Sequence, residues 1–313
     1  MPDSLTLWLI FIAVVVFMLA LDLGVFHKNP HKISVKEAAI WSAVWIGVSL
    51  LFNLGLYFYA GSELALKFLA GYLIEKSLSV DNIFVFVMLF SYFSVSPRHQ
   101  HRILFWGIIG AVVMRGLLIV AGVALINQFH WIIYLFGIFL IFTGYKMAFG
   151  KEDSVDPNKN PVLTFLENQK WLPVVNIFEE GKFFARHNGQ WVATPMFVVL
   201  IVVETTDVMF ALDSIPAILS ITTDTFIVLS SNIFAILGLR ALYFVLAGIM
   251  DIFHYLKYGL AIILSFVGLK MLISDIFHIP VGWALAVIGV ILLASILLSL
   301  HHNKNAKAAN LQS

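Results

Sequence analysis

Long apolar runs separated by shorter polar stretches dominate this chain. Several runs exceed about 18 residues, the length at which an α-helix can cross the hydrocarbon core of a bilayer. The pattern predicts nine spanning helices, near residues 5–26, 36–60, 64–93, 102–126, 129–149, 192–220, 226–249, 253–274 and 280–300. The expected fold class is therefore all-α: a polytopic membrane protein with about nine transmembrane helices.

Composition agrees with a membrane protein and excludes several other classes. Hydrophobic residues make up 61% of the chain and charged residues 12%, whereas soluble proteins carry about 25% charged residues. The net charge of +1 gives no sign of a nucleic-acid partner. The chain has no cysteine, which excludes disulfides, thiolate metal sites and cysteine-based redox chemistry. The start, Met1 to Ser4, has no basic region, so the first apolar segment is expected to be an anchor rather than a cleaved signal.

Lysine and arginine are distributed unevenly between alternate connections of the predicted helices. One set of connections holds fourteen of them, the other holds only Lys67, and four lie within spans. Because basic residues favour cytoplasmic loops, the N-terminus is predicted outside and the C-terminus in the cytoplasm.

Residues 150–191 form the only sizeable polar segment. The step Asn188-Gly189 between apolar residues favours a short β-hairpin there. We expect a cytoplasmic element that links two membrane halves, and a solvated linker without a function of its own is the alternative. The tail beyond His301 is polar and expected to be disordered.

Acidic residues recur inside the apolar segments in a duplicated pattern. The first copy reads Glu75-Lys-Ser-Leu-Ser-Val-Asp81-Asn82, and the second reads Asp207-Val-Met-Phe-Ala-Leu-Asp213-Ser214, with Glu204 three residues earlier. An ionised acid at mid-bilayer costs about 2.5–3.5 kcal/mol even on the most lenient scale. These acids are therefore expected to be paired, protonated or bound to metal, and they form the candidate functional site.

A second alignment extends this repeat. Residues 129–147 align without gaps to residues 253–271, with nine of nineteen positions identical, and Arg115 and Arg240 occupy similar places in the preceding helices. The predicted topology gives the two copies opposite directions, which is a transporter architecture with a polar site at the midplane. The expected domains are 1–60 (two helices), 61–149 (first repeat), 150–191 (linker), 192–275 (second, inverted repeat) and 276–313 (last helix and tail).

The candidate ligands are all oxygen donors: Glu75, Asp81, Asn82, Glu204, Asp207, Asp213 and Ser214. Carboxylate and carbonyl oxygens suit Mg²⁺, Ca²⁺ or Mn²⁺, and oxygen ligands alone do not separate these ions. Acids gathered in this way repel one another, which favours an exchange of protons for a divalent cation.

Helical geometry places most of these side chains on two faces. Glu75, Ser79 and Asn82 share one face of their helix, as do Glu204, Asp207, Ala211 and Ser214 of theirs. Asp81 and Asp213 lie about 100° away, so they either join through a local break or face a neighbouring helix. Candidate breaks are Ser77 and Ser79 in one copy and Ser214 to Pro216 in the other.

Basic side chains in the same segments are candidate counter-ions. Arg115 and Arg240 are expected to balance the acids rather than to contact a substrate, and Lys76 is a further supporting cation. Asp22 in the first helix is either an additional ligand or a capping or ion-pairing residue. A purely structural pairing of the acids with these cations and Lys270 is the alternative.

At these residues the chain resembles a known family. The segments Glu75 to Phe86 and Phe210 to Ala217 resemble the signature segments of the TerC family, and Gly181 to Pro195 is similar to its Alx-like bacterial members. The resemblance implies an inner-membrane protein of the LysE-type transporter group that exports manganese, with Glu75, Asp81, Glu204, Asp207 and Asp213 at the metal site.

The functional hypothesis is export of Mn²⁺ as substrate by a protein that is not an enzyme and has no resident cofactor. Protons are the candidate exchanged ion, and the lipid bilayer is the other expected partner. The alternative is a non-transporting membrane component of stress response, tellurite resistance or redox modulation. The sequence contains no CxxCH and no GxGxxG motif, so it gives the redox hypothesis no support.

Overall fold

The computed structural model describes residues 4–27, 34–93, 95–129, 131–149, 182–187, 190–247, 255–277 and 279–310. These residues form ten helices and one β-hairpin. The helices are α1 (Ser4–His27), α2 (Val35–Ala60), α3 (Ser62–Tyr92), α4 (Pro97–Gln128), α5 (Ile132–Phe149), α7 (Pro195–Leu219), α8 (Thr225–Leu237), α9 (Leu239–Leu246), α10 (Leu256–Leu272) and α11 (Val281–Asn310). The strands are β1 (Phe184–His187) and β2 (Gln190–Ala193).

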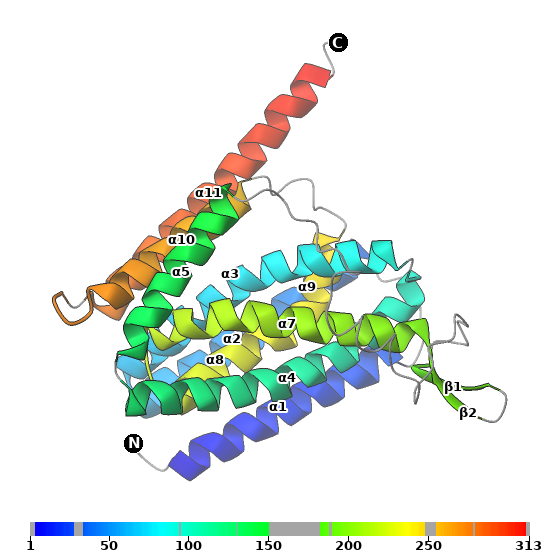
Figure 1. Cartoon of the computed structure of the whole chain (residues 1–313), viewed down its shortest axis with the longest axis horizontal. Coiled ribbons are helices and arrows are strands. Elements are labelled where there is room, and N and C mark those ends of the chain that lie inside the picture. Colours follow the sequence, from blue (N-terminus) through cyan, green and yellow to red (C-terminus); the bar gives the residue numbers. More distant parts are fainter. Residues whose placement is uncertain are drawn as a thin grey trace.

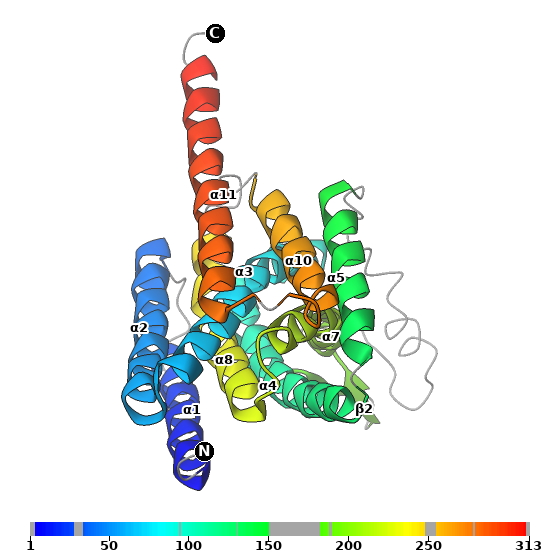
Figure 2. The same ribbon diagram turned by 90° about the vertical axis from the view of Figure 1, so that its left-hand side faces the viewer.

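The helices form a bundle with a second group packed across it. In Figure 1, α1, α4 and α7 run along the long axis of the bundle, and α5, α10 and α11 cross these helices at a steep angle. Within that second group α10 lies between α5 and α11 (Figure 2). The hairpin lies at one end of the bundle, and the N-terminus and the α4–α5 connection lie at the other (Figure 1).

Local sequence signals account for several helix ends. Proline occupies the first turn of α4 and of α7, where its missing N–H costs no helical hydrogen bond. The Asp224 carboxylate accepts hydrogen bonds from the backbone N–H groups of Phe226 and Ile227, the second and third residues of α8, and so caps that helix. Gly61 ends α2 at φ = +93°, a conformation that residues with a Cβ rarely adopt.

The helical membrane fold predicted from the sequence is confirmed. Within the described part of the chain, five helices are long and apolar enough to span a membrane, and α8 and α9, bent by 43° at Gly238, reach this length together as a broken span or a re-entrant loop. The other helices fall short of this test for local reasons: α10 has 17 residues, and α3 carries five charged residues along its length. The count of nine spans stays a prediction.

Three local predictions are corrected. Helix α11 continues to Asn310, so the disorder expected beyond His301 is wrong for the described part of the tail. The helices α3 and α7 are continuous, so the breaks expected at Ser77–Ser79 and at Ser214–Pro216 are wrong. The hydroxyl of Ser77 donates to the Leu73 carbonyl of its own helix at 2.5 Å, and Pro216 lies in the last turn of α7, where little helix follows it. The break that exists lies at Gly238, within a segment predicted as one helix.

The hairpin expected near Asn188 is confirmed by its two strands. They pair antiparallel, with Phe184 opposite Ala193 and His187 opposite Gln190. The hairpin continues to Ala193, so α7 begins at Pro195 rather than at the predicted residue 192. The rest of the predicted linker, residues 150–181, lies outside the described residues.

The packing of the helices relates the two halves of the chain. Helix α3 packs along α8, and α7 packs along α4, while α3 also contacts α7 and α5 contacts α10. A Cβ added at Gly144 would lie 2.7 Å from the carbonyl oxygen of Ala261, and one added at Gly268 would lie 2.6 Å from that of Gly137. In the sequence alignment Gly144 matches Gly268 and Gly137 matches Ala261. The contact of Gly144 with Ala261 and the contact of Gly268 with Gly137 are therefore equivalent in the two copies of the repeat.

Candidate functional site

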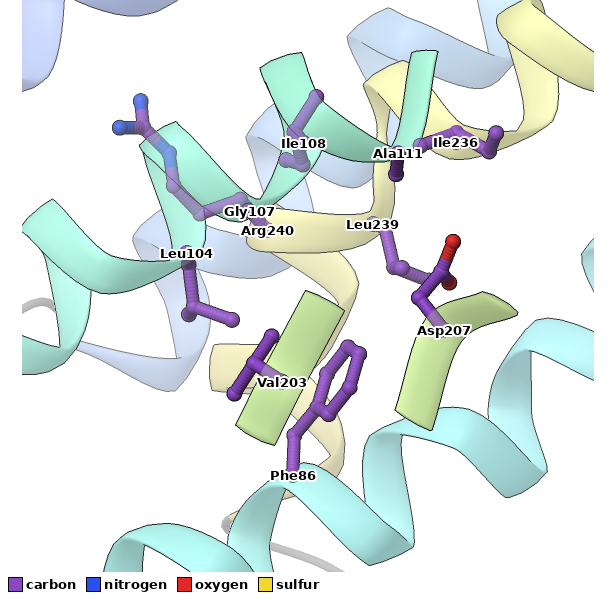
Figure 3. Close-up of a pocket in the computed structure, with 10 residues that line it drawn as sticks. All are labelled: Phe86, Leu104, Gly107, Ile108, Ala111, Val203, Asp207, Ile236, Leu239 and Arg240. Carbon is purple, nitrogen blue, oxygen red and sulfur yellow. The ribbon is translucent and has the colours of Figure 1, made fainter. Parts of the chain in front are cut away.

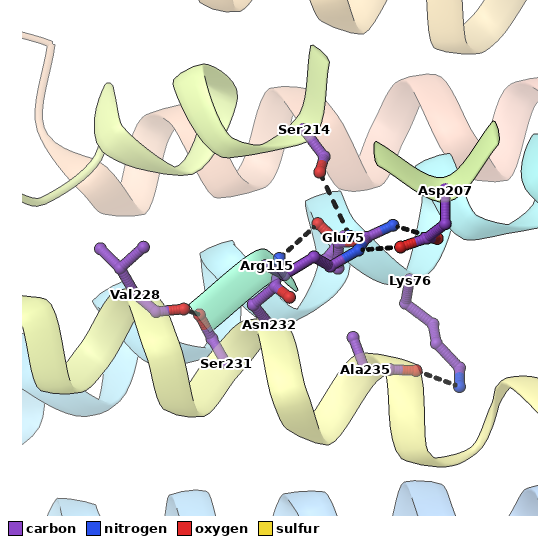
Figure 4. Close-up of polar contacts among 9 residues, drawn as sticks. All are labelled: Glu75, Lys76, Arg115, Asp207, Ser214, Val228, Ser231, Asn232 and Ala235. Atoms are coloured by element: carbon purple, nitrogen blue, oxygen red, sulfur yellow. Dashed lines mark hydrogen bonds and ion pairs between the residues drawn. The ribbon is translucent and has the colours of Figure 1, made fainter. Parts of the chain in front are cut away.

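A cluster of buried polar side chains lies where α3, α4, α7 and α8 meet. It contains Arg115 and Glu75 and Asn232, each 0% exposed, together with Ser214 at 2% and Asp207 at 4%. Each helix therefore contributes at least one polar residue to an otherwise apolar interior (Figure 4).

Arg115 of α4 connects the two acids of this cluster. Its Nε and Nη2 donate to both carboxylate oxygens of Asp207, at 2.9 and 2.8 Å. Its Nη1 donates to Oε1 of Glu75 in a short contact, and the same nitrogen lies 3.4 Å from the hydroxyl oxygen of Ser214 (Figure 4). The planar guanidinium thus holds one acid from each copy of the duplicated motif.

Two consecutive residues of α3 attach to α8. Asn232 donates through Nδ2 to Oε2 of Glu75 at 2.9 Å, and the ammonium of Lys76 donates to the carbonyl of Ala235 at 3.1 Å (Figure 4). Both contacts lie in the second half of α8, before the bend at Gly238. A Cβ at Gly238 would lie 2.9 Å from the Lys76 nitrogen, so glycine permits this close approach.

The electrostatics of the cluster follow from its burial. Removing charges from water is costly, and the cost is offset only when the charges are well paired and hydrogen-bonded. Two carboxylates and one guanidinium leave a formal charge of −1 on Glu75, Asp207 and Arg115 together. Arg115 is the cation that bridges the two carboxylates in this arrangement.

The face predicted on α3 is confirmed, because Glu75, Ser79 and Asn82 are all buried. On α7, Asp207, Ala211 and Ser214 are buried as expected, whereas Glu204 is only partly buried. The Glu204 carboxylate lies against α4, where a Cβ added at Gly110 would lie 1.9 Å from its Oε1.

The remaining predicted residues lie in different surroundings. Asp213 faces α5, where the hydroxyl of Thr143 donates to its Oδ1 at 3.2 Å. Arg240 is buried in α9. The side chains of Asp22 and Asp81 lie outside the described part of the structure. Asp213 was expected either to join the other acids through a local break or to face a neighbouring helix. The structure shows the second, because Asp213 contacts α5.

Among the described residues, no three histidine, aspartate or glutamate side chains lie close enough together to hold a metal ion. The structure joins Glu75, Asp207 and Ser214 through Arg115, and it places Thr143 of α5 against Asp213. The seven-residue ligand set therefore stays a prediction.

Sequence reasoning missed Asn232, which hydrogen-bonds to the motif acid Glu75. A signal was present, because Ser230-Ser231-Asn232 is a polar triplet within the apolar helix α8. All three residues are buried, as is expected of polar side chains that face the interior of a helix bundle in a membrane.

Comparison with known proteins places the chain in a family. The model of the family described as "Integral membrane protein TerC family" matches residues 60–307. A Salmonella typhi protein described as "Putative membrane-bound redox modulator Alx" is 50% identical over 312 residues, which cover 96% of each chain. The protein of the same description from Escherichia coli K12 is 49% identical over 302 residues, which cover 94% of each chain.

A third relative, "Uncharacterized membrane protein STKORF319" of Myxococcus xanthus, is 48% identical over 304 residues, covering 97% of this chain and 95% of the relative. No solved structure matches the chain. The family match spans most of the sequence and includes both copies of the acidic motif. The chain therefore belongs to the TerC family of integral membrane proteins.

Proposed function

We propose that this protein exports a divalent cation, Mn²⁺, from the cytoplasm through its buried carboxylates, in exchange for protons. The proposed setting is a bacterial inner membrane, with the N-terminus outside and the C-terminus in the cytoplasm. Membership of the TerC family and the distribution of basic residues support this setting.

One observation supports the proposal most strongly. The guanidinium of Arg115 is buried and binds one acid from each copy of the motif, Glu75 and Asp207. Ionisable residues inside a membrane are costly and usually mark an ion or proton pathway. Glu75 and Asp207 come from helices that pack together and run in opposite directions in Figure 1. This is the arrangement expected of a transporter built from inverted repeats.

The chemistry of the cluster suggests how a cation is accommodated. Arg115 acts as an internal cation that neutralises the carboxylates when no substrate is bound to them. Mn²⁺ favours carboxylate and carbonyl oxygens, so Glu75, Asp207 and the side-chain oxygens of Ser214 and Asn232 are suitable ligands once the guanidinium moves aside. Competition between the guanidinium and Mn²⁺ for the same oxygens prevents either from binding too tightly for turnover.

The bend between α8 and α9 supports the same proposal. Broken helices near the midplane expose backbone carbonyls, and transporters use such carbonyls around their ion sites. Here the ammonium of Lys76 already binds the Ala235 carbonyl next to the bend. A cation therefore occupies the C-terminal end of α8, where the helix dipole is negative.

The experiment is Mn²⁺ flux into proteoliposomes that contain the purified protein, with and without a pH gradient. We expect the gradient to accelerate flux in the wild type, and Glu75→Gln or Asp207→Asn to abolish it while the protein stays folded. Glu63→Gln is the matched control, because this acid is 80% exposed and pairs only with Lys67 of its own helix among the contacts seen.

Two results would contradict the proposal. The first is unchanged flux in both the Glu75→Gln and the Asp207→Asn variant, which would separate transport from the acidic motif. The second is no flux under any gradient from folded wild-type protein, which would favour the non-transporting alternative. In that case replacement of residues 150–191, rather than of the buried acids, should alter the cellular phenotype.

A further inference from the structure

A small pocket beside Asp207 has room for about one water molecule, with a volume of about 20 Å³. Figure 3 shows its lining, which is apolar except for Asp207 and the cationic Arg240. Such a lining does not suit a second cation. The features that point to a further partner lie instead on the β-hairpin at the end of the bundle.

The two sides of this hairpin differ in character. Its register pairs Ala185 with Val192 on one side, and these residues are only 4% and 3% exposed, so this side faces the protein. The large side chains of the other side are Phe184, 41% exposed, Trp191, 63% exposed, and the exposed Arg186 opposite Trp191. We call Phe184, Arg186 and Trp191 the outer side. A hairpin that faces water alternates apolar residues inward with polar residues outward, whereas two of these three outward residues are aromatic.

Positive charge accompanies the aromatic rings. Residues 182–194 include Lys182 and Arg186, both exposed, and contain no aspartate or glutamate. The guanidinium of Arg186 lies over the ring of Trp191, 5.9 Å from its centre. Large aromatic side chains combined with lysine and arginine are typical of protein surfaces that lie among lipid headgroups.

The hairpin is held in a fixed orientation at the start of α7. The backbone N–H of Thr194 donates to the carbonyl of Phe183 at 3.0 Å and closes the base of the hairpin. The guanidinium of Arg102 in α4 lies 5.5 Å from the centre of the Phe183 ring. The ring of Phe184 packs against Phe197 of α7, with 4.7 Å between the ring centres. The outer side therefore continues directly onto a membrane-spanning helix.

The length of α7 indicates the level of the hairpin relative to the bilayer. Its 25 residues form a helix about 37 Å long, whereas the hydrocarbon core is about 30 Å thick and the headgroups add about 5–7 Å on each side. Pro195, the first residue of α7, therefore lies near the boundary of the hydrocarbon core. The hairpin comes directly before it, at the end of the bundle where α4 and α7 begin (Figure 1), and so lies at the level of the headgroups.

We propose that the outer side of the hairpin, together with Lys182, binds the headgroups of anionic phospholipids in the leaflet on its side of the membrane. The rings of Phe184 and Trp191 lie in the interface, and the two basic side chains attract the negative headgroups. The contact holds the start of α7 at the membrane surface. This inference depends on the membrane location of the chain and not on the proposed transport function.

The test uses the absence of cysteine from the chain, so that one introduced thiol is the only one present. Phe184→Cys carries a nitrobenzoxadiazole fluorophore in phosphatidylcholine vesicles that contain nitroxide-labelled phosphatidylglycerol or, in a parallel sample, nitroxide-labelled phosphatidylcholine. Quenching reports which lipid contacts the label. Trp283→Cys is the matched control, because this aromatic residue is 71% exposed in the first turn of the spanning helix α11 and no lysine or arginine occurs between residues 271 and 303.

We expect both lipids to quench the label at Phe184→Cys, and phosphatidylglycerol to be preferred there. Each basic side chain should contribute about fivefold to this preference, the factor that corresponds to about 1 kcal/mol per charge at an anionic surface. At Trp283→Cys the two lipids should quench equally. Adding Lys182→Gln and Arg186→Gln to the Phe184→Cys chain should remove the preference and retain the quenching, in protein that still elutes as a monodisperse peak.

Three results would overturn the inference. Equal quenching by the two lipids at Phe184→Cys would show that the anionic headgroup is not recognised, and a preference that survives both glutamine substitutions would show that these charges do not cause it. Absence of quenching by either lipid would show that lipid does not contact the outer side. In that last case, shielding of the label from aqueous iodide would indicate a protein cover, and a cover lost on dilution with excess lipid would be a second copy of the chain.

Discussion

Replacing Arg115 by glutamine is the perturbation that tests the buried cluster most sharply. Glutamine keeps a polar side chain of moderate size but removes the positive charge and the forked donors that hold Asp207 and Glu75. Both carboxylates are buried, so neither can regain the lost interaction from water. We expect Arg115→Gln to destabilise the folded protein strongly.

The magnitude follows from the pairing. Removing one partner of a buried ion pair costs about 3–5 kcal/mol, because a buried charge is left without compensation. Each kcal/mol lowers Tm by roughly 2–4 °C in chains of some 150–250 residues, so Arg115→Gln should lower Tm by roughly 6–20 °C. Arg115→Lys keeps the charge but not the fork, and should fall between the glutamine variant and the wild type.

The assay is thermal unfolding of detergent-solubilised protein, followed by loss of the monodisperse peak in size-exclusion chromatography. A triple variant, Glu75→Gln with Arg115→Met and Asp207→Asn, removes all three charges together. It should recover most of the lost stability, because a neutral cluster leaves no uncompensated charge. An Arg115→Gln protein as stable as the wild type, or a triple variant no more stable than Arg115→Gln, would refute this reasoning.

Three further predictions follow from close contacts. Lys76→Met should cost about 1.5–3 kcal/mol, seen as a lower Tm, because the carbonyl at the end of α8 loses a charged donor; an unchanged Tm would contradict this. Gly110→Ala should displace the Glu204 carboxylate and lower Mn²⁺ efflux as Glu204→Gln does, and normal efflux in the alanine variant would show that this carboxylate position is unimportant. Gly144→Ala should cost about 1–3 kcal/mol, because the added methyl meets the backbone of α10, whereas Gly47→Ala, with open space around it, should leave Tm unchanged.

The membrane architecture could be predicted from the sequence because it depends on local properties. Apolar length determines which segments form spanning helices, and proline at residues 97 and 195 marks the starts of α4 and α7. The bend at Gly238 could not be predicted in this way. No proline or turn signal marks the segment around it, and the reason for glycine there is tertiary: Lys76 and Trp45 approach it from other helices.

The site could be predicted in part. The unusual position of acids inside apolar segments pointed to Glu75 and Asp207, and the same reasoning singled out Arg115 as a counter-ion. The partners of these residues depend on how the helices cross, which spacing along one helix does not determine. Asn232 was missed for this reason, and Asp213 faces Thr143 rather than the cluster that contains its motif neighbours.

The measurement that tests the central claim most directly is equilibrium binding of Mn²⁺ to the purified protein by titration calorimetry. The wild type and Glu63→Gln should bind Mn²⁺ at the same saturable site, and the double variant Glu75→Gln with Asp207→Asn should lose it. Saturable binding of equal affinity in the double variant would contradict the claim that the two carboxylates held by Arg115 form the cation site.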